Sequence, residues 1–294
     1  MSGYRRDRLS KLISHIMKID AHQHFWRYSP EEYAWITDDM TALKRDCLPE
    51  NLHGPLLDNG FDACVAVQAR QSETETDFLL ELAENAPFVK AVVGWVALQE
   101  SGLESRLEHY TGFKKLKGFR HIVQDEPDDN FILNKPFIRG VQLLGAFGFT
   151  YDILVYERQL PAVVRFLGHF EESQPFVLNH IGKPDIKRGM SQRWKDSIQE
   201  AARHPNLYCK ISGLVTEADW HNWKAEDFYP YLEHVLNVFG TERLMVGSDW
   251  PVCLLAADSY HQVIQLAEGF FSGLEESEKA MVFGANAARF YNIQ

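Results

Sequence analysis

The sequence predicts a (β/α)8 TIM barrel that forms a single domain. Eight short runs of apolar and β-branched residues recur along its 294 residues, and most are too continuously apolar for a sheet with one wet face. Helical segments separate these runs, so strand and helix alternate. One such barrel commonly occupies about 250 residues. The alternative, a doubly wound open sheet, usually has fewer strands, and no GxGxxG motif follows the first run.

The predicted strands are expected to pair in parallel and to be buried on both faces. Their carboxyl ends would then meet at one rim of the barrel, where active sites of this fold lie. The eight runs are residues 18–24, 63–69, 91–98, 116–123, 148–155, 175–180, 207–213 and 244–250.

Helical segments fill most of the chain between the strands. Ser72 and Glu75 form a capping-box pattern, and Asn134 is a plausible N-cap with Pro136 in the first turn. The stretch 25–60 has no clear periodicity, and a loop of that length in a compact domain is often functional. Further helical segments are 157–172, 190–203, 227–239, 256–271 and 275–290.

Composition excludes several classes of protein. Thirty basic and 41 acidic residues give a net charge of 30 − 41 = −11, which argues against a nucleic-acid-binding surface and against docking on anionic lipid. No apolar run approaches the roughly 20 residues of a membrane span. The four cysteines form no CxxC pair, so a zinc ribbon is excluded. Buried free thiols in a reducing, cytoplasmic setting are expected.

Residues 1–16 are expected to form an extension outside the barrel, which then spans residues 17–294. The segment is basic but lacks the roughly 7–15-residue apolar core of a secretory signal. Met17 stands directly before the first predicted strand. A short amphipathic helix over the same residues is the competing interpretation.

Four polar residues stand at the ends of three predicted strands. His22 and His24 close the first strand, and both point into the barrel because side chains alternate along a strand. His180 ends the sixth strand and Asp249 the last. Alone, each histidine suits a structural role and Asp249 suits a helix cap. Together at one rim, the four predict a site for one divalent ion, zinc above all.

A cationic side chain is predicted at the same rim. Arg120 and His121 end the fourth strand and alternate in direction, so only one of them faces inward. We expect it to be Arg120, because a guanidinium can hold a carbonyl or carboxylate with two hydrogen bonds. A surface salt bridge from Arg120 to Asp125 or Glu126 is the alternative.

Aromatic and amide side chains near the rim are candidates for binding a sugar. Indoles can stack on the apolar face of a sugar ring, and amides can bond its hydroxyls, although roles as loop anchors stay open. Lys183 either meets the substrate or simply lies beside Pro184, and Glu217 and Asp219 look like solvated charges. The candidates are Trp26, Trp35, Trp220, Gln68 and Gln124.

This set of motifs resembles the amidohydrolase superfamily. IDAHQHFW, LNHIGKP and VGSDWP match its HxH, later histidine and final aspartate signatures. The finer resemblance, through GFRHIVQDEPD, ISGLVTEADW and GANAARFY, is to the lactonase-type branch, whose members hydrolyse sugar lactones and related dicarboxylate lactones. It implies a hydrolase that opens a ring ester by attack of water, with Asp249 as the general base and the three histidines or their ion facing the carbonyl.

The sequence departs from the binuclear members of that superfamily. Those carry a carboxylated lysine that bridges two metals, whereas the predicted fifth strand offers Thr150, Tyr151 and Asp152, and Lys117 and Lys210 lie on other strands. A two-metal site is therefore not expected. The resemblance implies one divalent ion of weak or dispensable importance, which suits a lactone because it is a better electrophile than an amide.

Two other functions stay open at this point. A metal-dependent decarboxylase of the same superfamily uses a similar histidine and aspartate set, but it needs a cationic pocket for a substrate carboxylate. A non-catalytic barrel that binds a sugar would keep the aromatic residues without needing Asp249 or three convergent histidines. The expected partner is a small sugar lactone, with no nucleic acid and no membrane, and a homo-oligomer remains open.

Overall fold

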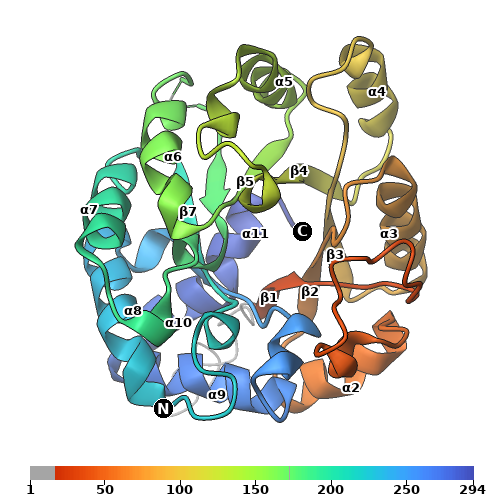
Figure 1. Ribbon diagram of the computed structural model, residues 1–294. Helices are drawn as coiled ribbons and strands as arrows, with labels where there is room; N and C mark the ends of the chain where they lie inside the picture. The colour runs from red at the N-terminus through yellow and green to blue at the C-terminus, as the bar shows by residue number, and fades with distance from the viewer. Residues whose placement is uncertain (1–16, 172) are drawn as a thin grey trace, which may run out of the picture.

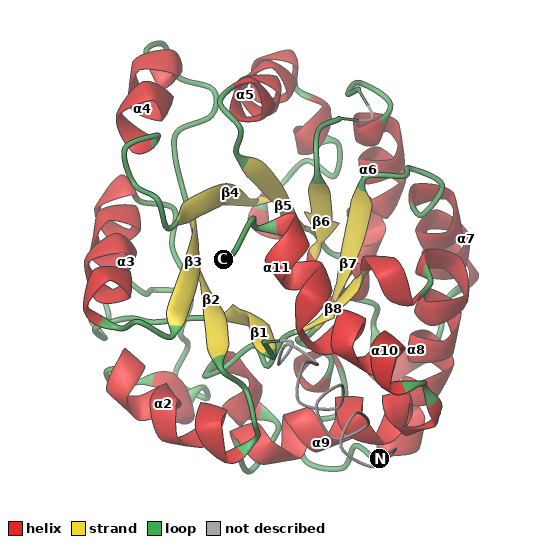
Figure 2. Ribbon diagram, turned by 180° about the vertical axis from the view of Figure 1, so that it is seen from behind, coloured by secondary structure: helices red, strands yellow, loops and turns green. Residues whose placement is uncertain are grey.

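The computed structural model describes residues 17–171 and 173–294 and contains the predicted (β/α)8 barrel. Eight strands, each parallel to the next, follow one another around the sheet in chain order, and helices surround them (Figure 2). The predicted extension, residues 1–16, lies outside the described residues. The strands are β1 (Ile19–Gln23), β2 (Ala63–Val67), β3 (Val89–Gly94), β4 (Leu116–Ile122), β5 (Thr150–Leu154), β6 (Phe176–Leu178), β7 (Leu207–Ile211) and β8 (Leu244–Val246).

Most helices lie where the sequence predicts them. Ser72 begins the helix after β2, but its side chain makes no capping bond, because Glu75 instead accepts hydrogen bonds from the backbone of Ala69 and Arg70. The helices are α2 (Pro49–Asp58), α3 (Glu73–Asn85), α4 (Leu103–Tyr110), α5 (Lys135–Ala146), α6 (Leu160–Leu167), α7 (Gln192–Ala201), α8 (Ala225–Phe239), α9 (Tyr260–Phe270), α10 (Glu276–Ala280) and α11 (Asn286–Phe290).

The stretch without clear periodicity contains a helix that the sequence analysis missed. Helix α2 begins at Pro49, a residue favoured in the first turn, and buries Leu52 and Leu56. Gly54 and Pro55 inside the helix conceal its period, since both residues normally mark turns. The first strand therefore also has its covering helix.

The seam between β1 and β8 brings the first and last predicted site segments together. The backbone N–H of Asp249 donates to the carbonyl of His22 at 2.8 Å, and the N–H of His24 donates to the carbonyl of Trp250 at 2.7 Å. The approach is close, because a Cβ on Gly247 would lie 2.6 Å from the Cβ of His22. Only glycine fits there, so this residue sets the spacing across the seam.

Two apolar layers hold the barrel. The outer layer lies between strands and helices, and the inner one fills the barrel with alternate strand residues such as Val65, Val93 and Met245. Tyr291 joins the inner layer, and the C-terminus lies near the centre of the ring of strands in Figure 1. The four cysteines are buried and free, and no described helix is long and apolar enough to cross a membrane.

Candidate active site

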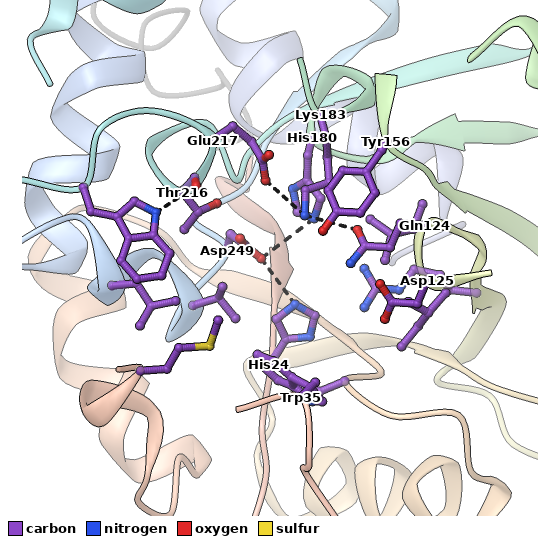
Figure 3. Close-up of a pocket in the computed structure, with 18 residues that line it drawn as sticks. His24, Trp35, Gln124, Asp125, Tyr156, His180, Lys183, Thr216, Glu217 and Asp249 are labelled. Carbon is purple, nitrogen blue, oxygen red and sulfur yellow. Dashed lines mark hydrogen bonds and ion pairs between the residues drawn. The ribbon is translucent and has the colours of Figure 1, made fainter. Parts of the chain in front are cut away.

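The four residues predicted at the strand ends converge on one spot, and Figure 3 shows His24, His180 and Asp249 there. Oδ1 of Asp249 lies 3.3 Å from Nε2 of His24, 3.7 Å from Nε2 of His22 and 3.9 Å from Nε2 of His180. All four side chains are almost completely buried. Residues up to 227 positions apart in the chain therefore form one cluster at the carboxyl ends of β1, β6 and β8.

The backbone at two of these positions is strained. Asp249 has a φ of 58° and His180 a φ of 53°, in the left-handed region that side chains other than glycine rarely adopt. Ile181 and Lys183 share that conformation. A Cβ on Gly213 would lie 2.4 Å from Nδ1 of His180, so only glycine lets the imidazole sit there. Such strain typically gathers at functional sites, where it fixes the direction of a side chain.

Burial keeps His24 and His180 neutral. It lowers the pKa of His24, and it lowers the pKa of His180 to about 3. The N–H at Nδ1 of His24 is held by the carbonyl of Val67 at 2.8 Å, which leaves Nε2 with its lone pair toward the site. Burial alone would raise the pKa of Asp249, but its surroundings, with His180, His24 and the cationic Lys183, outweigh burial and lower that pKa below its usual value of 3.8. Asp249 is therefore a carboxylate at neutral pH.

His22 has an unusual neighbour for a histidine at such a site. Nζ of Lys210 lies 3.3 Å from Nδ1 of His22 and donates to Oδ2 of Asp152 at 2.7 Å. Because an ammonium only donates, Nδ1 of His22 is the acceptor, and its Nε2 carries the hydrogen toward His24 at 3.3 Å. Tyr291 also donates to Asp152, at 3.0 Å. The sequence alone did not predict this network. Its one indication in the sequence is Lys210, a lysine inside the apolar strand β7.

Arg120 points inward, as predicted. Its Nη1 donates to Oδ1 of Asn179 at 3.1 Å and lies 3.3 Å from Nε2 of His22, and its Nη2 donates to the carbonyl of Gln68. The alternative salt bridge does not form, because Glu126 pairs instead with His121 at 2.8 Å. Arg120 thus brings a buried positive charge to the cluster.

A cavity of about 350 Å³ opens above these residues. Its floor contains His24, Arg120, His180 and Asp249, and Figure 3 shows side chains from several strand-end loops around it. One part of its wall is polar, with Gln124, Tyr156, Lys183 and Glu217, whereas Trp35, Met40, Trp220, Val252 and Leu255 contribute apolar surface.

Three of the five predicted sugar-binding residues line the cavity, and two do not. Trp35, Gln124 and Trp220 line the cavity. Trp26 does not, because it is buried edge-on against Trp35 and donates to the carbonyl of Arg45. Gln68 is also buried behind the wall, where its amide donates to the carbonyl of Arg120 at 3.1 Å. These two residues therefore support their neighbours and do not face the cavity.

The donor atoms suit a single divalent ion. Nε2 of His22, Nε2 of His24 and Oδ1 of Asp249 are separated by 3.3 to 3.7 Å. A tetrahedral ion with bonds of about 2.0–2.1 Å needs ligand atoms about 3.4 Å apart, so the spacing fits zinc. His22 can bind an ion only after its Nε2 gives up the hydrogen, because Lys210 stands at Nδ1, where metal-bound histidines normally have an acceptor.

The comparisons with known proteins agree with the motifs. The family model described as "Amidohydrolase" matches residues 19–293. Two proteins named L-fucono-1,5-lactonase, from Burkholderia multivorans and Burkholderia ambifaria, are 44% and 35% identical to this chain, and each alignment covers 94% of this chain and 96% of the relative. A crystal structure of an amidohydrolase from Burkholderia multivorans with bound zinc has a TM-score of 0.91 at 43% identity and covers 95% of this chain and 100% of that one. The predicted family is thereby confirmed: this chain is a member of the amidohydrolase family.

Proposed function

We propose that this protein hydrolyses the ring ester of a sugar lactone, an L-fucono-1,5-lactone or one of the same kind. The main support is the pair of relatives with that name, which align with nearly the whole chain. The cavity supports it too, because about 350 Å³ with a carboxylate on its floor suits a single sugar ring.

Asp249 is the general base of the proposed reaction. It accepts a proton from water while the water oxygen attacks the lactone carbonyl carbon. The ring C–O bond of the tetrahedral intermediate then breaks, and the proton passes from Asp249 to the ring oxygen, which leaves as an alcohol. The product is the open-chain sugar acid. A carboxylate with a low pKa is a weak base, and a reactive ester such as a lactone needs no stronger one.

Arg120 is placed to stabilise the oxyanion. It brings a guanidinium to the floor of the cavity. One donor aimed at a developing oxyanion typically contributes about 100- to 1,000-fold in rate. When a divalent ion is bound at His22, His24 and Asp249, it supplies Lewis-acid polarisation of the same carbonyl.

The walls of the cavity match the two sides of a sugar ring. Trp35, Trp220 and Met40 offer apolar surface to the C–H face of the ring. Gln124 and Tyr156 offer polar atoms to its hydroxyl groups. The decarboxylase alternative has less support, because a substrate carboxylate would meet a cavity wall on which Lys183 is already paired with Glu217.

A lactone panel tests the proposal. Purified protein should release acid from L-fucono-1,5-lactone or a related aldono-1,5-lactone, measured with a pH indicator well above the spontaneous rate in heat-inactivated controls. If no member of a broad panel of 1,4- and 1,5-aldonolactones is hydrolysed faster than in the control, the proposal is wrong.

A further inference from the structure

The polar wall of the cavity contains a lysine that is held by two partners. Nζ of Lys183 lies 3.0 Å from Oε1 of Glu217 and 3.1 Å from Oε1 of Gln124. It also lies 4.8 Å from the centre of the Tyr156 ring. These residues follow β4, β5, β6 and β7, and all four line the cavity around Asp249 (Figure 3). The sequence analysis treated Glu217 as a solvated charge, but the fold places it in the wall.

The pair is ionic and faces the cavity. Burial works against the ammonium of Lys183, yet the adjacent carboxylate of Glu217 outweighs it and raises the pKa of Lys183. The two side chains are 15% and 16% exposed, so the cavity reaches both of them. Lys183 thus already has a counter-ion at contact distance, with which a substrate carboxylate would have to compete.

The charges around the cavity favour a neutral ligand. Among the described residues of its wall, apart from the floor residues His24, Arg120, His180 and Asp249, the cation is Lys183 and the carboxylates are Asp125 and Glu217. The wall therefore carries a formal charge of 1 − 2 = −1. The chain as a whole carries −11. A lactone with an additional carboxylate would therefore enter against a negative field.

The pair also matches a sugar diol. Lys183 has three N–H donors, of which two are directed to Glu217 and Gln124. Glu217 has two acceptor oxygens, of which Oε1 holds Lys183. The remaining donor and acceptor fit two neighbouring hydroxyl groups, one of which accepts from the ammonium while the other donates to the carboxylate.

We infer that the ion pair Lys183–Glu217 determines specificity: it binds hydroxyl groups of a neutral sugar lactone and excludes lactones that carry a further carboxylate. This inference rests on the proposed lactonase activity and names the residues that restrict it to uncharged, polyhydroxylated lactones. Glu217 is the decisive residue, since without its charge Lys183 becomes a free cation in the wall.

A charge-removing substitution tests the inference. Glu217→Gln keeps the size of the side chain and its acceptor oxygen, and it changes the formal charge of the wall from −1 to neutral. The probes are an aldonolactone and the aldarolactone of the same ring size and configuration, in which a carboxylate replaces the terminal CH2OH group. The ratio of kcat/KM for the neutral to the anionic lactone should be high in the wild type and should fall about tenfold in Glu217→Gln, chiefly through a lower KM for the anionic lactone.

Two further variants complete the test. Lys183→Gln makes the lining more negative, so the ratio should rise. Asp219→Asn removes the same charge from the same loop, where Asp219 lies 3.9 Å from Lys187 outside the cavity lining, and it should leave the ratio unchanged.

The outcomes separate this inference from the proposed function. An equal ratio in wild type and Glu217→Gln would contradict the inference and leave the pair as a structural tie between two loops. Equal hydrolysis of both lactones by the wild type would also contradict it, although the lactonase activity would stand. Hydrolysis of neither lactone, nor of any other in the panel, would overturn the proposed function itself.

Discussion

Two lysine–carboxylate pairs differ in what surrounds them: a lower pair, Lys210 and Asp152, buried outside the lining of the cavity, and an upper pair, Lys183 and Glu217, in its wall. Lys210 and Asp152 are 2.7 Å apart, completely buried, and enclosed by His22, Asn179 and Tyr291. Lys183 and Glu217 are 3.0 Å apart and border the cavity. The lower pair has its hydrogen-bonding capacity taken up by protein, whereas the upper pair keeps some for a ligand.

The surroundings of a lysine–carboxylate pair therefore decide whether it fixes neighbouring residues in place or can contact a ligand. Buried charges are costly unless they are paired and hydrogen-bonded, so the lower pair is fixed in place and fixes His22 in turn. A partly exposed pair contributes little to stability, and it is free to exchange partners with a substrate.

The largest expected effect is on stability. Lys210→Met leaves Asp152 buried without its cation, and the free energy of unfolding should fall by about 3–5 kcal/mol. The matched change Lys183→Met should cost less, because that pair borders the cavity and water there can solvate the remaining carboxylate. Urea denaturation of the two variants measures both losses. Equal losses would show that the two pairs do not differ in role.

Arg120 lies between the lower pair and the cavity, and its loss should act on the rate. Arg120→Met should reduce kcat/KM by about 100-fold, because it removes a donor for the oxyanion. Arg120→Lys should not restore the rate, since a compact ammonium does not reproduce the planar fork whose two Nη atoms separately bond Asn179 and the carbonyl of Gln68. Steady-state kinetics test this, and near-wild-type turnover by Arg120→Lys would contradict it.

The pH dependence of the rate tests the protonation state of Asp249 on the floor of the cavity. The pKa of Asp249 is held below 3.8, and a general base must be deprotonated, so its contribution is lost only as the pH falls through that low value. The kcat/KM for a neutral lactone should therefore show no acid limb between about pH 7 and about pH 4.5. A midpoint near pH 6 would instead assign the base to a group with a raised pKa.

The smallest expected effect is that of metal removal. Lys210 and Arg120 place two cations beside His22. A metal ion bound at the floor of the cavity would therefore be repelled by both of them. Chelation followed by removal of the chelator should lower kcat by less than about tenfold. Metal content and activity are measured on the same sample. A complete loss that zinc reverses would contradict this expectation.

The fold and the floor of the cavity were predictable, because both follow from local patterns. Continuous apolar runs define buried parallel strands, and polar residues at their ends must meet at one rim, as His22, His180 and Asp249 do. The roles proposed for these residues remain predictions. Helix α2 was not predictable by its period, since Gly54 and Pro55 interrupt it.

The two ion pairs were not predictable, because their partners come from different strands and loops. Lys210 and Asp152 lie 58 positions apart and meet only inside the closed barrel. Glu217 stands in a charged stretch that looks solvated in the sequence, and only the fold turns it toward Lys183. Burial and pairing of this kind depend on the three-dimensional arrangement of the strands.

The most direct test of the account is lactone hydrolysis by Asp249→Asn beside Asp152→Asn. Asparagine at 249 preserves the shape of the floor and removes the base, so kcat should fall by at least about 100-fold with the free energy of unfolding nearly unchanged. Asparagine at 152 should mainly destabilise the protein, because Lys210 loses its counter-ion. Turnover by Asp249→Asn within about tenfold of the wild type would contradict the assignment of Asp249 as the base.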